Sequence, residues 1–239
     1  MTRPKPWVSP NHDERPDQVI DTLVLHYTGM KTAGEAILRL CDPAAKVSAH
    51  YVIEEDGTIY QLVPEERRAW HAGVSYWRGR RQLNDVSIGI EIVNPGHEWG
   101  YKSYPAQQMA SVTDLCRQIL SRHPVPARNV VGHSDIAPDR KQDPGEKFDW
   151  HTLAENGIGI WPPVPDLGTS SVPHDAEILS PVRQALADIG YDVALEGPID
   201  PNLSNVLRAF QRHWRQEAVN GQPDRGTVAR IFGLLASLY

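Results

Sequence analysis

His26, His133 and Asp143 are the side chains whose types could together carry out chemistry. His26 lies in the apolar stretch LVLHYTG, and the other two lie in VVGHSDIAPDRKQDPG. A histidine in an apolar strand is more often a hydrogen-bonded core residue than a ligand, so LVLHYTG alone favours packing. Two neutral imidazoles and one carboxylate can, however, supply three ligands to Zn²⁺ and leave its fourth position open, as in catalytic zinc sites. The spacing of these three residues along the sequence does not by itself identify a zinc site.

The elements expected around these residues alternate between strands and helices. Strands are predicted in DTLVLHYTG, in two runs around the turn at Asp56-Gly57, in DVSIGIEIVN and in NVVGHSD. Helical spacing of apolar residues occurs in TAGEAILRLCD and in AQQMASVTDLCRQILSRHP. This alternation predicts an α/β fold with a mixed central β-sheet flanked by helices. His26 and His133 then lie at strand ends, where sites on such sheets are commonly built.

A change in composition predicts two domains. The stretch GIWPPVPDLGTSSVPHD is rich in Pro, Gly, Ser and Thr, and we interpret residues 166–174 as a linker between residues 1–165 and 175–239. Beyond it, three segments show helical spacing and predict a small C-terminal three-helix domain, near the lower size limit for independent stability.

Composition excludes several classes of protein. The net charge of −6 and the pI of about 5.9 argue against nucleic-acid binding. The N-terminus does not resemble a signal peptide, and no run of about 20 apolar residues predicts a transmembrane segment. The two cysteines, Cys41 and Cys116, indicate neither a disulfide framework nor a cysteine zinc site. We therefore expect a cytoplasmic protein, or a periplasmic one if an export signal was removed; the oligomeric state is left open.

Four motifs, taken in order, resemble a known enzyme family. They are LVLHYTG, SAHYVIEEDGTIYQLVPEERRAWHAGVS, LNDVSIGIEIVN and VVGHSDIAPDRKQDPG, and the resemblance runs from about residue 20 to residue 162. The chain is similar to the zinc-dependent N-acetylmuramoyl-L-alanine amidases of the amidase-2 type, the AmpD/AmiD group, which is related to T7 lysozyme and the peptidoglycan recognition proteins. The resemblance implies a zinc ion held by His26, His133 and Asp143, with Glu91 and Lys141 beside it.

The implied activity is hydrolysis, by a zinc-activated water, of the amide between N-acetylmuramic acid, or its 1,6-anhydro form, and the L-alanine of the stem peptide, in peptidoglycan recycling or turnover. Glu91 interrupts an apolar strand, where a carboxylate is costly to bury, so we interpret it as the general base. Lys141 is interpreted as the residue that stabilises the tetrahedral oxyanion. Without the resemblance, Lys141 would be interpreted as a solvated surface lysine. The alternative function is a non-catalytic peptidoglycan sensor on the same fold.

Substrate binding is predicted for Trp70, His71, Arg80, Arg81 and Asn84. Aromatic faces suit sugar rings and arginines suit peptide carboxylates. The segment AGVSYWRGRRQLND is expected to be a loop. Some family members have an arginine where this chain has Gln82, so it is left open which arginine binds the carboxylate of the stem peptide. His50 is expected to be a hydrogen-bonded scaffold residue.

The C-terminal segment resembles small three-helix peptidoglycan-binding modules in VRQALADIGYDV and VLRAFQRHWR. The implied partners are peptidoglycan fragments or the sacculus, although helix packing explains the same residues equally well. Two further residues are interpreted structurally: Asp135 as a turn or cap residue, and His213 as a surface or packing residue.

Overall fold

A mixed six-stranded sheet forms the centre of the fold in a computed structural model, which describes residues 4–16, 19–163 and 176–238. The strand order is β1-β5-β4-β9-β3-β10, and of these neighbours β4 and β5 run antiparallel while the other pairs are parallel. The strands are β1 (Lys5–Pro6), β3 (Thr22–Tyr27), β4 (Tyr51–Ile53), β5 (Ile59–Gln61), β9 (Ser87–Ile92) and β10 (Val130–Gly132).

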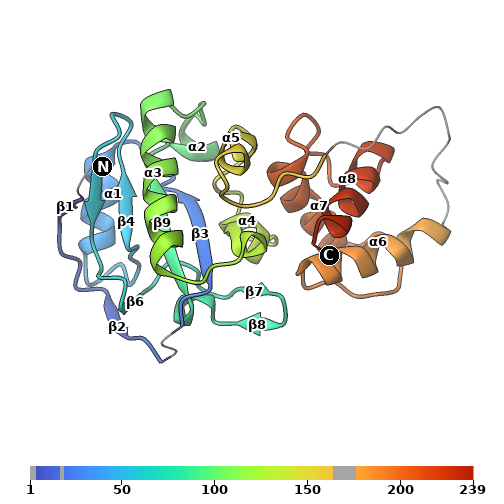
Figure 1. Cartoon of the computed structure of the whole chain (residues 1–239), viewed down its shortest axis with the longest axis horizontal. Coiled ribbons are helices and arrows are strands. Elements are labelled where there is room, and N and C mark those ends of the chain that lie inside the picture. The colour runs from blue at the N-terminus through green and yellow to red at the C-terminus, as the bar shows by residue number, and fades with distance from the viewer. Residues whose placement is uncertain (1–3, 17–18, 164–175, 239) are drawn as a thin grey trace.

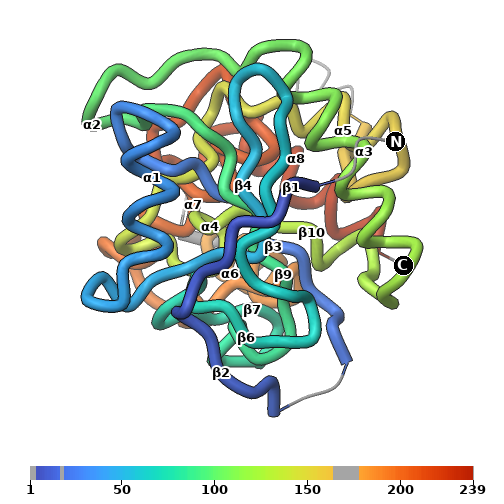
Figure 2. Tube along the Cα trace, turned by 90° about the vertical axis from the view of Figure 1, so that its left-hand side faces the viewer, coloured from blue at the N-terminus to red at the C-terminus, as the bar shows by residue number. Residues whose placement is uncertain are grey.

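Helices cover both faces of this sheet. The long helix α3 (Ala106–Arg122) shares one apolar cluster with Leu23 and Ile90, and α1 (Ala33–Cys41) packs on the opposite face, where Ile37 and Val52 belong to another cluster. Figure 2 shows α1 and α3 on opposite sides of the strands. The strand β9 lies between β3 and β4 with both faces covered, which explains its nearly continuous apolar sequence.

Several elements are too short to produce a recognisable periodicity. The strand β2 (His12–Glu14) pairs with β6 (Arg67–Ala69), and short helices or 3-10 turns connect the larger elements. These short elements are η1 (Leu83–Asp85), α2 (Gly96–Trp99), η2 (Ala127–Asn129), α4 (His133–Ile136) and α5 (Trp150–Glu155).

The segment AGVSYWRGRRQLND, expected to be a loop, contains a β-hairpin instead. Strands β7 (Tyr76–Trp77) and β8 (Arg80–Arg81) pair antiparallel across Arg78 and Gly79. Both turn residues have positive φ, 51° and 81°, as a two-residue type I′ turn requires. The arginine at the first turn position hid this signal, because glycine or asparagine is more usual there.

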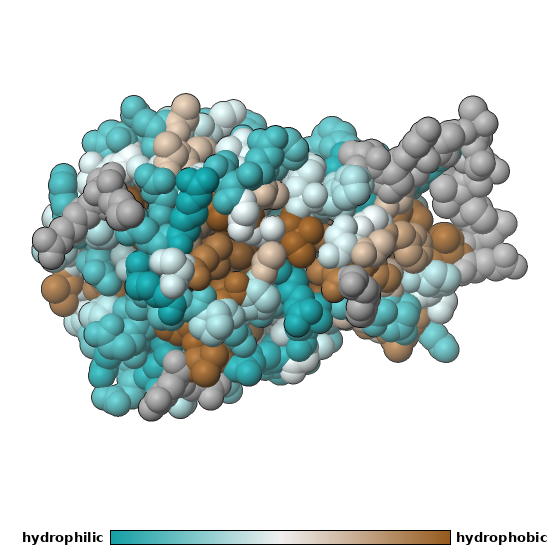
Figure 3. Space-filling model, viewed as in Figure 1, coloured by the Kyte–Doolittle hydropathy of each residue, from teal (hydrophilic) through white to brown (hydrophobic). Residues whose placement is uncertain are grey.

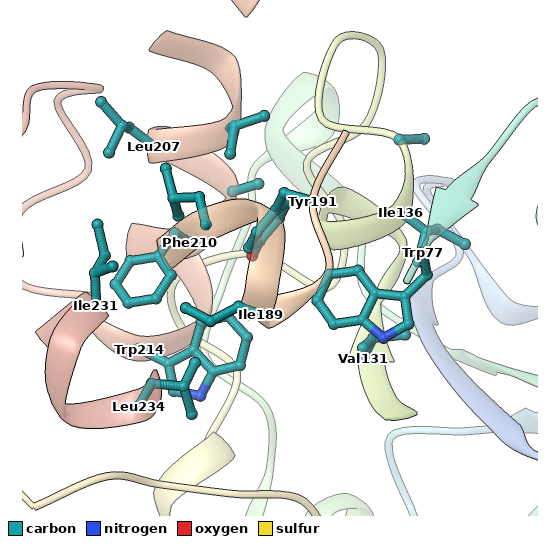
Figure 4. Packing of buried hydrophobic residues seen from close by; sticks show 14 of the residues in the cluster. Trp77, Val131, Ile136, Ile189, Tyr191, Leu207, Phe210, Trp214, Ile231 and Leu234 are labelled. Atoms are coloured by element: carbon teal, nitrogen blue, oxygen red, sulfur yellow. The ribbon is translucent and has the colours of Figure 1, made fainter. Parts of the chain in front are cut away.

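Three C-terminal helices pack against the part of the chain that contains the sheet (Figure 1). They are α6 (Ala176–Ile189), α7 (Pro201–Trp214) and α8 (Arg225–Ala236). A single apolar cluster joins Val131 and Ile136 to Tyr191 and Phe210 (Figure 4), and apolar surface is visible where the two parts meet (Figure 3). The proposed linker, residues 166–174, lies outside the described residues, so the division into domains stays a prediction.

Candidate metal centre and active site

A cavity of about 450 Å³ opens where β3 and β9 end. His26 of β3 and Glu91 of β9 are direct neighbours in the parallel register and therefore lie on the same face of the sheet. His133 is the first residue of α4 and follows directly on β10, the other neighbour of β3. The sheet thus brings together side chains that are more than 100 positions apart in the sequence.

The three candidate ligands are in contact with one another and are almost fully buried. His26 Nδ1 lies 2.9 Å from His133 Nδ1, and Asp143 Oδ2 lies 3.1 Å and 3.0 Å from these two nitrogens. Asp143 reaches them because its backbone carbonyl accepts from Ser134 N–H at 2.9 Å, which folds the intervening loop back onto α4. These residues form a potential metal-binding cluster.

Hydrogen bonds behind the ligands determine which ring nitrogens carry protons. His133 Nε2 lies 3.2 Å from the Ala72 carbonyl, which can only accept, so Nε2 carries the proton and Nδ1 has a free lone pair. Ser87 Oγ donates to the Leu83 carbonyl and accepts from His71 Nε2, which leaves His71 Nδ1 to accept from His26 Nε2 at 3.1 Å. Such hydrogen bonds orient metal-bound histidines in general.

The donor set therefore fits a divalent cation. Two imidazole lone pairs and a carboxylate oxygen face one another at about 3 Å. Without a positive charge between them this arrangement is repulsive, and nitrogen and oxygen ligands of this kind suit Zn²⁺. The structure thus explains why these three residues converge.

The local environment keeps His26 and Asp143 in their metal-binding protonation states. Burial, followed by the neighbouring His133, lowers the pKa of His26 to about 4 against the opposing effect of Asp143. Burial alone would raise the pKa of the Asp143 carboxyl, but the two histidines outweigh burial and hold that pKa well below its usual range. At neutral pH the histidine is neutral and the carboxylate ionised, as coordination requires.

Glu91 lines the same cavity, and one of its carboxylate oxygens lacks a hydrogen-bond partner in the part of the chain that the structure describes. Its Oε2 atom is buried and has no hydrogen-bond partner among the described residues. Burial, followed by the charge of Asp143, raises its pKa well above the usual value, while Lys141 opposes the shift. A carboxylate with a raised pKa is a stronger base, so this geometry suits proton transfer. Lys141 lines the cavity beside Asp143.

The predicted substrate-binding residues separate into two groups. Trp70 and His71 line the cavity, and Asn84 lines an adjoining hollow, where its Oδ1 accepts from His71 N–H and Ala72 N–H. Arg80 and Arg81 are exposed on β8 and do not line either hollow; Arg81 pairs with Asp192 at 2.9 Å. For all five residues, substrate binding stays a prediction.

Other cationic and aromatic residues line the two hollows and were not predicted. Tyr27 and Arg39 line the cavity, and Arg140 lines the adjoining hollow while donating to the Ala72 carbonyl at 2.7 Å. Tyr27 could have been suspected because it follows His26 in the sequence. Arg39 and Arg140 carry no sequence signal, because their positions depend on how α1 and the loop after α4 pack.

Gly89 makes room for the histidine that supports His26. A Cβ atom at Gly89 would lie 2.4 Å from His71 Cγ, and the Gly89 N–H donates to His50 Nδ1 at 3.0 Å. The latter bond agrees with the scaffold role expected for His50.

We expect Gly89→Ala to displace His71 and so weaken metal binding about 10- to 100-fold, as loss of a supporting hydrogen bond commonly does. Competition with a chelator measures the affinity. Gly34→Ala is the control, since nothing lies within 4 Å of its Cβ position and alanine favours the helix. Equal affinity in both variants would contradict a supporting role for His71.

Comparison with known proteins gives the family. The profile of the Amidase_2 family, N-acetylmuramoyl-L-alanine amidase, matches residues 16–146, which include all three candidate ligands. AmiD of Escherichia coli is 37% identical over 232 residues, covering 90% of this chain and 82% of AmiD. The chain belongs to the Amidase_2 family. AmpD of Escherichia coli is 41% identical over 160 residues, covering 59% of this chain and 85% of AmpD.

Solved structures of Amidase_2 proteins share the fold. AmiD of Escherichia coli, in complex with anhydro-N-acetylmuramic acid-L-Ala-D-gamma-Glu-L-Lys, superposes with a TM-score of 0.80 and 36% identity, covering 91% of this chain and 89% of that one. AmpDh3 of Pseudomonas aeruginosa gives a TM-score of 0.81 and 35% identity, covering 93% and 94%. The expected fold class, family and amidase activity are thereby confirmed.

Proposed function

We propose that this amidase uses zinc to hydrolyse the amide between N-acetylmuramic acid, or its 1,6-anhydro form, and the L-alanine of the stem peptide. The observation that carries the proposal is the convergence of His26, His133 and Asp143 in a cavity that Glu91 also lines, with its Oε2 atom buried and without a partner among the described residues. The relatives agree in chemistry: AmpD of Escherichia coli is a 1,6-anhydro-N-acetylmuramyl-L-alanine amidase, and AmpDh3 has been solved with an anhydromuramic pentapeptide.

In this mechanism the residues of the cavity have separate roles. His26, His133 and Asp143 would hold the zinc ion, which when bound polarises a carbonyl and makes water nucleophilic near neutral pH. Glu91 Oε2 takes a proton from the attacking water and gives it to the departing amine of L-alanine. Lys141, which also lines the cavity, offsets the negative charge that develops on the carbonyl oxygen.

The cavity wall suits a sugar joined to an acidic peptide. Trp70 supplies an aromatic face for a sugar ring, and Arg39 supplies a positive charge for a peptide carboxylate. Asn84 would act indirectly, by holding the backbone of His71 and Ala72.

Peptide release tests the proposal directly. The purified protein is incubated with soluble anhydro-muropeptides and, separately, with sacculi, and free stem peptide is measured by mass spectrometry. We expect release that a chelator abolishes and added zinc restores. A zinc-loaded sample that releases no peptide from either substrate would refute the proposed amidase activity. Tight muropeptide binding without zinc, together with no hydrolysis when zinc is present, would favour the sensor.

The location of the enzyme and the role of its C-terminal helices are open to the same assay. Among residues 4–16, 19–163 and 176–238, no helix has the length and apolar character needed to cross a bilayer. The proposed cytoplasmic location predicts faster turnover of soluble fragments than of sacculi. Glycan binding by residues 175–239 predicts retention of the protein on sacculi, measured by sedimentation.

A further inference from the structure

The C-terminal helices contact both segments that carry the candidate ligands His133 and Asp143. Helix α7 packs on α4, which begins with His133. Arg212 of α7 donates from Nη2 to Gln142 Oε1 at 3.2 Å, one residue before Asp143, and Gln216 donates to the Phe148 carbonyl at 2.6 Å. His26, by contrast, lies in a strand that is paired on both sides within the sheet.

The central contact is a buried carboxylate, that of Asp135, which is 1% exposed. Its Oδ2 accepts from Gly132 N–H at 2.8 Å, which is the capping role expected from the sequence. Its other two donors come from the C-terminal part of the chain: the O–H of Tyr191, two residues after the end of α6, donates to Oδ1 at 2.6 Å, and Nδ1–H of His213 in α7 donates to Oδ2 at 2.7 Å. An ionised carboxylate is this deeply buried only when its oxygens are paired.

The surroundings make these two donors rigid. His213 stacks between Trp150 and Trp214, with ring centroids 3.7 Å and 3.6 Å away. Tyr191 packs edge-on against Trp77, with ring centroids 5.1 Å apart, and Figure 4 places it where the C-terminal helices meet Ile136 and Trp77. Neither donor can swing away without disturbing the apolar cluster that joins the two parts of the chain.

The position of Asp135 connects this contact to the metal centre. Asp135 and His133 belong to the same helix, which has only four residues. A single turn of helix has little stability of its own, so external contacts must fix its position. The orientation of the His133 ring toward the Ala72 carbonyl and toward Asp143 depends on that position.

We propose that Tyr191 and His213 are positioning residues for the active site. By holding Asp135, they hold α4 and therefore His133 at the metal. The inference rests on the metal site proposed above. It gives the C-terminal helices a structural role in metal binding, in addition to any contact they make with peptidoglycan.

The test compares two variants of the full-length chain. Tyr191→Phe/His213→Phe removes both donors and keeps the aromatic rings. Thr227→Val is the matched control, because it removes a buried hydroxyl of α8, which accepts from Gln211 Nε2 at 2.9 Å. Its hydrogen-bond partners do not include Asp135, Tyr191 or His213. Zinc affinity is measured by competition with a chelator, and hydrogen exchange is measured on the metal-free proteins.

We expect the double variant to bind zinc about 10- to 100-fold more weakly than the unaltered chain, the usual effect of losing a residue that orients a ligand. Its kcat should fall while KM changes little, and residues 130–148 should exchange faster than in the control. Thr227→Val should lower the melting temperature only. If the double variant does not fold, Tyr191→Phe alone is expected to show the same differences at smaller size.

Equal zinc affinity and equal exchange of residues 130–148 in the double variant and the control would overturn the inference and leave Asp135 as an ordinary interface residue. Failure of the unaltered chain to bind zinc would instead contradict the proposed metal site. The two failures are therefore distinguishable.

Discussion

Replacing His26 with alanine is expected to abolish zinc binding and to lower kcat/KM by at least about 10³-fold, because a catalytic metal supplies several kcal/mol of transition-state stabilisation. Only His133 and Asp143 would remain as protein ligands. Without a bound cation, nothing would offset the repulsion between their ligand atoms. The loss should exceed that from any residue that acts indirectly.

The sheet should remain folded in this variant. His26 lies in β3, whose neighbours Leu23, Val24 and Leu25 are completely buried and whose pairing with β9 and β10 does not involve the side chain. The cost to stability should be about 1–3 kcal/mol, because His71 Nδ1 loses its hydrogen-bond partner. Metal content by mass spectrometry and circular dichroism would separate loss of metal from loss of fold.

A histidine remote from the cavity serves as the control. His123 follows α3 and pairs with Glu65 at 2.6 Å, so His123→Ala should keep both zinc and activity. A His26→Ala protein that stays fully active and zinc-loaded would show that this histidine is a packing residue, as the stretch LVLHYTG alone suggests.

Glu91→Gln is expected to keep zinc and lose about 10²- to 10⁴-fold in kcat, the usual contribution of a general base. Glutamine has nearly the same shape but cannot accept the proton from the attacking water. Glu91 is not among the three clustered ligands, so metal content should match that of the unaltered chain. Loss of zinc together with activity would instead make Glu91 part of the metal-binding set.

The pH profile gives an independent readout for the same residue. A general base works only when ionised, so activity should fall as the pH drops through the pKa of Glu91. Burial and Asp143 raise that pKa, which places the acid limb of kcat/KM above the usual range of a glutamate, about 4.3. The residual activity of Glu91→Gln should lack this limb. An unchanged limb in the variant would assign it to another group.

Much of the sheet could be predicted from the sequence because its strands and long helices bury continuous faces. The apolar runs around His26 and Glu91 correspond to β3 and β9, and the helical spacing at Ala106–Arg122 corresponds to α3. The resemblance to the amidases added the metal-ligand set, since its motifs appear in order with consistent spacing. Short elements such as α4 escaped prediction, because a single turn shows no period.

The sequence by itself determined the fold class, the family and the candidate ligands, because these depend on local patterns and ordered motifs. Only the tertiary structure decided that Arg39 and Arg140 line the hollows while Arg80 and Arg81 lie outside them. It also decided that Asp135 is held by donors 56 and 78 positions away. The physical reason is that such contacts depend on how the C-terminal helices dock, and no local periodicity encodes that packing.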